Sequence, residues 1–404
     1  MSSVDCSNVF PWTDHPTLWL KLYQKGLGGP LFDWIRVLYI KLHYKISMNK
    51  ELSDEFMSLI GIFTGDSLSP DFWDYFIADY KPPSNEDDVL FGGTAVGNLE
   101  QADDMVLFSL SAIGLQHKLD YTWHYASVNF LLVNIVKTMT MIFGPIHRNI
   151  SPSTFVFDGV PIKFTDEYTY VGVTFASNCT NIFARHYAKK AAKAPSIVNV
   201  AFALDSFVGV LPPFEGKRLY SAHVDPHLTS ACEVSLDVNM TLLAPLQKVL
   251  QHTFLCRLLG LNPRSMCAFL FLKTGLPPIP YRWIDLALHY MLYIVSLTPS
   301  HLALCALQEC QSLYTAGKPC WLGDLAIVVG CMPCQTPFFD PSVLTIDSIR
   351  KLIDDVKASM EAHIDSSIQA STKGVLLCGW LERNDDGALV HHSMHFHHYL
   401  CYNP

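Results

Sequence analysis

Hydrophobic and polar positions in the first 180 residues follow two different periods. Apolar residues recur at helical spacing after Pro30, and again between Ser111 and Ser127, which predicts amphipathic helices. Period-2 alternation, which is typical of strands, occurs at residues 44–48 and 52–57, and further strands are expected at 137–143, 155–162 and 168–175. This mixture predicts an α+β fold in which helices back an antiparallel sheet.

Cap and turn residues refine these elements. Thr13 or Asp14 can cap a helix, and Ser69 followed by proline opens another one. The alternation after residue 44 predicts a hairpin with its turn near Asn49, and Asp158-Gly159 predicts the turn of a second hairpin.

The chain becomes mainly helical beyond Ala184. Residues 184–204 are rich in Ala, residues 242–261 repeat Leu at helical spacing, and prolines at 277–280 precede another long helix. The apolar run 286–297 is shorter than the 18 or so residues of a membrane span, so we expect a buried helix and no membrane partner. The predicted domains are 1–180, 181–300 and 301–404.

Composition indicates a folded intracellular protein. Hydrophobic residues make up 50% of the 404 positions, which is enough for a large core. We predict no signal peptide, because no basic segment is followed by an apolar run at the start. The 12 cysteines lack framework spacing, as reduced thiols do. We therefore expect a nuclear or cytoplasmic protein rather than a secreted one.

Charge is distributed unevenly along the chain. The net charge is −9, yet residues 181–300 hold 11 Lys and Arg against 6 Asp and Glu, a local charge of +5. Contacts from Lys and Arg to phosphates supply most non-specific affinity for nucleic acid. We therefore predict that any such binding maps to 181–300, with Lys189, Lys190 and Lys193 taking part, although ordinary surface variation explains the asymmetry equally well.

Three acids suggest a metal centre. Asp103 and Asp104 are adjacent carboxylates before an apolar run, and Asp5 follows another one. Burying such acids costs free energy unless a cation neutralises them. They would suit two Mg²⁺ ions, which lie about 3.5–4 Å apart in two-metal sites. We then expect Asp5 and Asp103 to converge at one sheet edge. The alternative is that Asp103 and Asp104 are solvated turn acids and Asp5 lacks fixed structure.

Five segments are similar, in order, to motifs of one family. Residues 5–10 (DCSNVF) resemble D-[LA]-x-K-A-F, residues 61–70 (GIFTGDSLSP) resemble G-V-R-Q-G-D-P-L-S-P, residues 101–104 (QADD) resemble [YF]-A-D-D, residues 132–138 (LVNIVKT) resemble L-x-x-N-x-x-K-T, and residues 170–173 (YVGV) resemble Y-L-G-V. The chain thereby resembles the reverse transcriptase domain of non-LTR (LINE-type) retrotransposons. The resemblance covers most of residues 1–300, and is looser after Val173.

The resemblance implies a palm at 1–180, a helical thumb at 181–300 and a C-terminal helical region without an assigned role. It implies an RNA-directed DNA polymerase that uses an RNA template, a DNA primer and deoxynucleotides. The residues it assigns are Asp5, Asp103 and Asp104 as catalytic ligands of Mg²⁺ or Mn²⁺, Lys137 as the acid that protonates pyrophosphate, and Phe10, Thr64, Gly65, Asp66 and Gln101 as nucleotide contacts. Phe10 would screen the sugar for a 2′-hydroxyl, but a core role explains it as well, and Lys137 is equally a surface lysine.

The chain departs from the family at functional positions. Phe63-Thr64 replace Arg-Gln, Gln101 replaces an aromatic residue, and Glu100 adds an acid. The family has a fingers subdomain before the first metal ligand, whereas Asp5 is the fifth residue here. We therefore expect a partial, degenerate copy with weak or no polymerase activity. The alternative is a non-catalytic retroelement fragment that at most binds nucleic acid.

A third hypothesis concerns the C-terminal region. Cys331 and Cys334 form a CxxC pair, and residues 391–401 hold several histidines and Cys401. Together they would supply ligands for zinc, although a lone CxxC is more often incidental.

Overall fold

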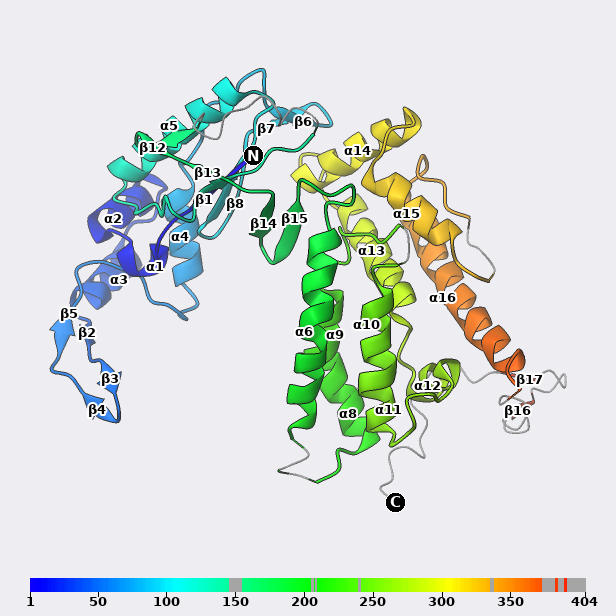
Figure 1. The fold of residues 1–404 in the computed structure, drawn as a ribbon. Coiled ribbons are helices and arrows are strands. Elements are labelled where there is room, and N and C mark those ends of the chain that lie inside the picture. The colour runs from blue at the N-terminus through cyan, green and yellow to red at the C-terminus, as the bar shows by residue number, and fades with distance from the viewer. Residues whose placement is uncertain are drawn as a thin grey trace. The chain divides into compact units, whose positions relative to one another are not determined.

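A computed structural model describes residues 1–144, 155–204, 207, 209–238, 241–334 and 338–372, with the side chains of 251–252 left out, and the backbone of 382–383 and 389–390. The chain separates into two compact units, Met1–Val171 and Gly172–Pro404. Helices and strands are mixed (Figure 1), which is compatible with the α+β class expected from the sequence.

The first unit is built on a five-stranded sheet with the order β13-β10-β1-β9-β8. Strand β1 (Ser2–Asp5) lies between β9 (Asp104–Leu107) and β10 (Met139–Thr140), antiparallel to both. Strand β8 (Asn98–Gln101) forms a hairpin with β9. The expectation of a purely antiparallel sheet is wrong at one edge, where β13 (Lys163–Phe164) runs parallel to β10. A parallel pair needs a long crossover connection, and here the hairpin of β11 (Val156–Phe157) and β12 (Val160–Pro161) lies within it.

Three helices back this sheet. Helices α2 (His15–Gln24), α4 (Ser69–Ile77) and α5 (Ala112–Val128) pack against the strands. The core they form includes Leu18, Leu22, Trp73, Phe76, Leu115 and Leu119 from the helices and Val4, Met105 and Leu107 from the sheet. Successive residues of a strand point to opposite faces. Val4 and Met105 therefore face the helices, and Asp5 and Asp104 face away from them.

Local signals of the sequence reappear in the helix ends and hairpins. The Asp14 carboxylate accepts a hydrogen bond from the Thr17 amide at 2.9 Å and caps α2. Ser111 caps α5 in the same way. The hairpin of β3 (Ser47–Met48) and β4 (Glu51–Leu52) turns at Asn49 and Lys50, both at positive φ. These predictions are confirmed. The remaining elements of the first unit are α1 (Val9–Trp12), α3 (Pro30–Ile40), β2 (His43–Tyr44), β5 (Phe56–Met57), β6 (Val89–Phe91), β7 (Thr94–Val96) and β14 (Glu167–Tyr170).

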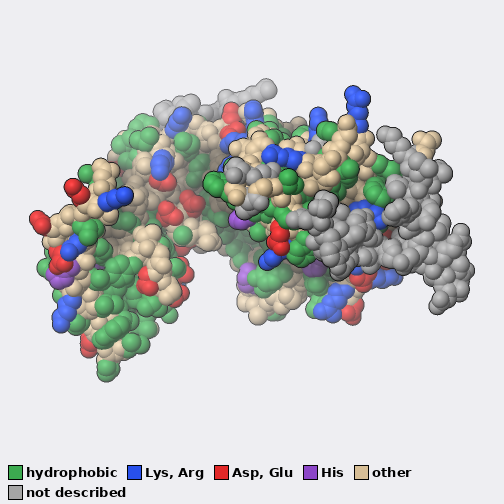
Figure 2. All heavy atoms as spheres, turned by 90° about the horizontal axis from the view of Figure 1, so that it is seen from below, with side chains coloured by type: hydrophobic (Ala, Val, Ile, Leu, Met, Phe, Trp, Pro, Cys, Tyr) green, Lys and Arg blue, Asp and Glu red, His purple; other side chains and the backbone are tan. Residues whose placement is uncertain are grey.

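Helix α3, which the sequence predicts as amphipathic, leaves several of its apolar side chains exposed. Leu31 and Trp34, which follow helical spacing, are exposed by 70% and 61%, and Ile40 is exposed by 63%. Tyr39 is the buried residue of this helix. Hydrophobic side chains also gather on the surface of the first unit in Figure 2. Periodicity alone therefore predicted the helix correctly but not its burial.

The second unit is mainly helical. It opens with β15 (Val173–Ala176) and continues through α6 (Ala184–Phe202), α8 (Pro213–Leu219), a π-helical turn (Tyr220–Val224), α9 (Asp225–Thr229), α10 (Ala244–Lys248), a π-helix (Val249–Leu255), α11 (Cys256–Leu258), α12 (Cys267–Thr274), α13 (Ile279–Val295), α14 (Leu302–Thr315), α15 (Trp321–Gly330) and α16 (Ile346–Gln369). Two short strands, β16 (Glu382–Arg383) and β17 (Leu389–Val390), pair further on.

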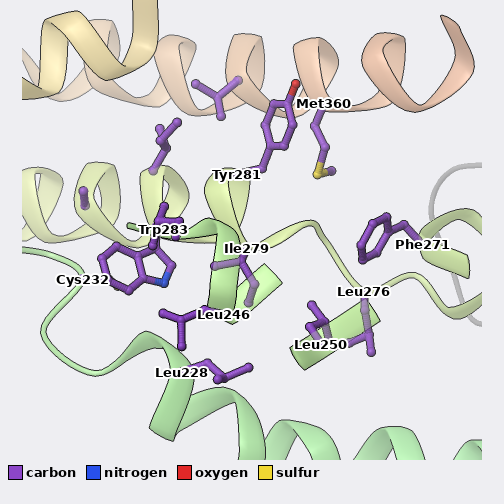
Figure 3. Packing of buried hydrophobic residues seen from close by; sticks show 14 of the residues in the cluster. Leu228, Cys232, Leu246, Leu250, Phe271, Leu276, Ile279, Tyr281, Trp283 and Met360 are labelled. Carbon is purple, nitrogen blue, oxygen red and sulfur yellow. The ribbon is translucent and has the colours of Figure 1, made fainter. Parts of the chain in front are cut away.

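One hydrophobic cluster joins the helices of the second unit. It includes Leu228 of α9, Leu246 of α10, Trp283 of α13 and Met360 of α16 (Figure 3). Residues of the predicted regions 181–300 and 301–404 both contribute to this cluster. Among the described residues, none of the helices combines the length and the apolar character that crossing a bilayer requires.

Candidate functional site

Asp5 and Asp104 face each other on adjacent strands. The pairing of β1 with β9 sets the Cα of Asp5 opposite that of Asp104, and the pairing of β8 with β9 sets Gln101 opposite Asp104 on its other side. Directly opposed residues of an antiparallel pair project to the same face, with Cβ atoms about 4.5–5.5 Å apart. Asp5, Asp104 and Gln101 therefore form one row across three strands.

Asp103 lies in the two-residue turn that joins β8 to β9. The turn consists of Ala102 and Asp103, both exposed, and Ala102 has a φ of 54°. The indole Nε1–H of Trp73 donates a hydrogen bond to the Ala102 carbonyl at 2.7 Å. Trp73 is only 1% exposed. The acid-bearing turn is thus anchored to helix α4.

The charges of Asp5 and Asp103 act on two neighbouring groups, the Asp104 carboxyl and the Cys6 thiol. Burial raises the pKa of Asp104, and the negative charges of Asp103 and Asp5 raise it further. The thiol of Cys6 responds to the same charges: burial raises its pKa to about 12, with contributions from Asp5 and Asp103. Like charges that share a site disfavour ionisation of each other. A cation bound between these acids would relieve that repulsion.

The segment Asn134–Thr138 holds the backbone of Asp5. The Asn134 amide donates to the Asp5 carbonyl at 2.8 Å, and the Asp5 amide donates to the Thr138 hydroxyl at 3.4 Å. The Asn134 carbonyl accepts from the Thr138 amide at 2.9 Å, which closes the turn. Lys137, carried on this turn, places its Nζ 3.7 Å from Asp5 Oδ2. The structure therefore brings together Asp5, Asp104, Asp103 and Lys137.

Ser3 and Tyr168 lie on the acid-bearing side of the sheet and were not singled out from the sequence. Ser3 is two residues before Asp5 on β1, so it shares the face of Asp5. Its hydroxyl donates to the hydroxyl of Tyr168. Burial raises the pKa of Tyr168, the bond from Ser3 lowers it, and Asp104 and Asp5 raise it. Period-2 counting along β1 was the signal available for Ser3, but none pointed to Tyr168.

The other predicted nucleotide contacts lie in two places. Phe10 is half-buried and packs edge-on against Trp73, with ring centroids 6.4 Å apart. Thr64, Gly65 and Asp66 lie in the loop before α4, where Asp66 accepts a hydrogen bond from the Leu68 amide at 3.3 Å. Within the described residues, no hydrogen bond links this loop to the acids. Phe10, in contrast, is connected to the acid turn through Trp73.

The donor set has the chemistry that hard cations require, because carboxylate oxygens are the preferred protein ligands of Mg²⁺. Over the residues that the structure describes, no group of three or more His, Cys, Asp or Glu is arranged as a ready metal cage. The Cys334 thiol lies 3.5 Å from the Ser366 hydroxyl, and Cys331 is exposed. The histidines and Cys401 of the zinc hypothesis lie outside the described residues.

One lysine of α6 is not available to a partner. Lys190 is 5% exposed, and its Nζ donates to the His227 carbonyl at 2.9 Å and to the Ser230 hydroxyl at 2.6 Å. Burial lowers the pKa of Lys190 to about 8. Lys189 and Lys193, one and three positions away, are exposed. Of the three lysines predicted to take part in nucleic-acid binding, Lys190 is therefore buried, whereas Lys189 and Lys193 are exposed.

Comparison with known proteins gives one informative similarity. No protein-family model matches the chain. Over 185 residues, 44% of its length, the chain is 26% identical to the retrovirus-related Pol polyprotein of the type-2 retrotransposable element R2DM from Drosophila melanogaster. The matched region spans 18% of that polyprotein. The similarity supports a retrotransposon-related protein of the non-LTR class.

Proposed function

We propose that the first unit is a reverse transcriptase-like palm of retroelement origin. In this proposal its acids bind divalent cations and its RNA-directed DNA polymerase activity is weak or lost. The observation that carries the proposal is the pairing of Asp5 with Asp104 on adjacent strands, with Asp103 in the adjoining turn. The order of the five motifs and the similarity to a Pol polyprotein support it. Mg²⁺, when bound, would supply charge neutralisation at the attacking and leaving oxygens of a phosphoryl transfer.

Each residue of the cluster has a role in this proposal. Asp5, Asp103 and Asp104 would hold the cations through carboxylate oxygens. The Lys137 Nζ lies 3.7 Å from Asp5 Oδ2, and its side chain is 67% exposed. In the proposal this ammonium lies beside the cations and would give a proton to departing pyrophosphate. Phe10 would limit the space beside the sugar, held there by Trp73.

The expected loss of activity follows from the residues around the acids. Gln101 stands beside Asp104 in the row, where the family has an aromatic ring. Phe63 and Thr64 replace the Arg-Gln pair, which removes polar contacts to the nucleotide. Catalysis of this type depends mainly on positioning, and a displacement of about 1 Å can cost roughly 10²-fold in rate. Retained acids are therefore compatible with little turnover.

Two measurements test the proposal. Manganese binding, followed by the electron paramagnetic resonance signal of free Mn²⁺, should saturate for the full chain and weaken strongly in Asp5→Asn and Asp104→Asn variants. Unchanged Mn²⁺ binding in both variants would refute the proposed metal site. Primer extension with an RNA template, a DNA primer, deoxynucleotides and Mg²⁺ should give little or no product. Robust extension that Asp103→Ala abolishes would show that the catalytic apparatus is intact.

A second function, nucleic-acid binding by the second unit, is favoured by one observation. The exposed Lys189 and Lys193 lie on the same helix within a region of local charge +5. Lysine side chains bind the phosphates of a nucleic-acid backbone. The second unit would therefore bind a nucleic-acid duplex whether or not the first unit catalyses polymerisation.

A further inference from the structure

We infer that Trp73 is a positioning residue for the acid cluster, an inference that rests on the proposed function of that cluster. Its indole donates to the Ala102 carbonyl at 2.7 Å. The Ala102 carbonyl belongs to the same planar peptide group as the Asp103 amide. A hydrogen bond that fixes the Ala102 carbonyl oxygen therefore fixes the orientation of the peptide group between Ala102 and Asp103. The direction in which β9 begins is fixed with it.

The turn needs such an external hold. Ala102 has a φ of 54°, a left-handed conformation that is unfavourable for a residue with a Cβ. Ala102 and Asp103 are both exposed, so their side chains gain little from packing. A hydrogen bond from a buried, immobile donor offsets part of the cost. Trp73 meets this requirement because it is 1% exposed and stacks on Phe76 with ring centroids 5.6 Å apart.

Trp73 also connects the acid turn to the proposed sugar screen. The same indole packs edge-on against Phe10 at a centroid distance of 6.4 Å. The Phe10 carbonyl in turn accepts a hydrogen bond from the Ile62 amide at 2.7 Å, which fixes the backbone on the other side. One side chain thus sets the relative placement of Phe10 and Asp103. Trp73 is surrounded in α4 by other apolar residues. The sequence alone therefore could not distinguish a positioning role of Trp73 from ordinary core packing.

The test compares Trp73→Phe with Trp19→Phe in the full chain. Phenylalanine keeps an aromatic ring at position 73 but removes the N–H donor. Trp19 is a matched control, because it belongs to the same core and packs edge-on against Phe32, Tyr39 and Phe72. Amide hydrogen exchange over residues 98–107 and binding of Mn²⁺ alone are measured for each protein. The α5 segment reports whether the unit stays folded.

We expect Trp73→Phe to speed exchange at the turn about fivefold, the effect of one hydrogen bond, and to weaken Mn²⁺ binding by a similar factor, with α5 unchanged. Trp19→Phe should do neither. Unaltered exchange at the turn in Trp73→Phe, or an increase spread evenly over the whole unit, would overturn the inference. Faster exchange confined to the turn in a protein whose wild type binds no Mn²⁺ would uphold the positioning role and refute the proposed metal site.

If Trp73→Phe fails to fold, the wild-type protein provides the test. With ¹⁵N-labelled tryptophan, the indole signal of Trp73 should broaden on addition of Mn²⁺, since its donor reaches the acid turn, and it should broaden more than that of Trp19. Equal broadening of both signals would contradict the inference.

Discussion

Replacing Lys118 with methionine should open the edge of the sheet that carries the acids. Lys118 extends from α5 with its side chain fully buried, and it forms an ion pair with Asp88, whose side chain is 2% exposed. Its Nζ also donates to the Phe108 carbonyl at 2.7 Å and lies 3.4 Å from the Gly97 carbonyl. A Cβ at Gly97 would lie 2.6 Å from Nζ. One ammonium therefore ties α5 to the base of the β8–β9 hairpin, where Gly97 precedes β8 and Phe108 follows β9.

The size of the effect follows from burial. Removing one partner of a buried ion pair costs about 3–5 kcal/mol, because the other charge is left buried and unpaired. Burial by itself would raise the pKa of Asp88, whereas hydrogen bonds from Lys118, Ser84 and the Asn85 amide hold it below its usual value. Without Lys118 the carboxylate loses its main partner. Since about 1.4 kcal/mol corresponds to tenfold, exchange protection in β8 and β9 should fall by roughly 10²-fold or more.

Amide hydrogen exchange resolved by peptide measures this loss without assuming that both units unfold together. Lys137→Met is the matched control, because Lys137 also pairs with an aspartate but is 67% exposed, and surface pairs contribute about 1 kcal/mol or less. Adding Asp88→Asn to Lys118→Met should recover part of the protection by removing the unpaired charge. Equal losses in Lys118→Met and Lys137→Met would refute the reasoning.

Two further predictions concern pH and salt. Burial raises the pKa of Glu100 to about 7, although a hydrogen bond from Asn98 opposes the shift. In the unfolded chain this carboxyl has its ordinary pKa of 4.5, so the folded state binds more protons than the unfolded state between these two values. Protection of the β8–β9 hairpin should therefore fall as pH rises from about 4.5 to about 7. Glu100→Gln should remove this dependence, and an identical pH profile in both proteins would contradict it. Nucleic-acid binding by the second unit should weaken steeply with salt and decrease in Lys189→Glu and Lys193→Glu, whereas tight binding that ignores salt would count against the proposal.

Local elements were predictable from the sequence because their signals are local. Asp14 marks the start of α2, because its carboxylate accepts a hydrogen bond from the Thr17 amide. Asn49, Asp158 and Gly159 have positive φ, a backbone conformation that these residue types adopt more readily than most others. The helices at 30–40 and 279–295 followed from spacing of apolar residues. Each of these depends on a few neighbours in the chain. The order of the motifs, through the family resemblance, assigned Asp5, Asp103 and Asp104 to one predicted metal site.

Tertiary structure alone decided which residues meet. The register of β1 against β9 makes Asp5 the partner of Asp104, and nothing between positions 5 and 104 of the sequence specifies that register. Helical spacing could not show that Leu31 and Trp34 of α3 would stay exposed, or that Lys190 would be buried beside exposed Lys189. The bond from Trp73 to Ala102 joins residues in different elements. Burial and long-range pairing depend on where other segments pack, which is a property of the folded chain and not of any one stretch of its sequence.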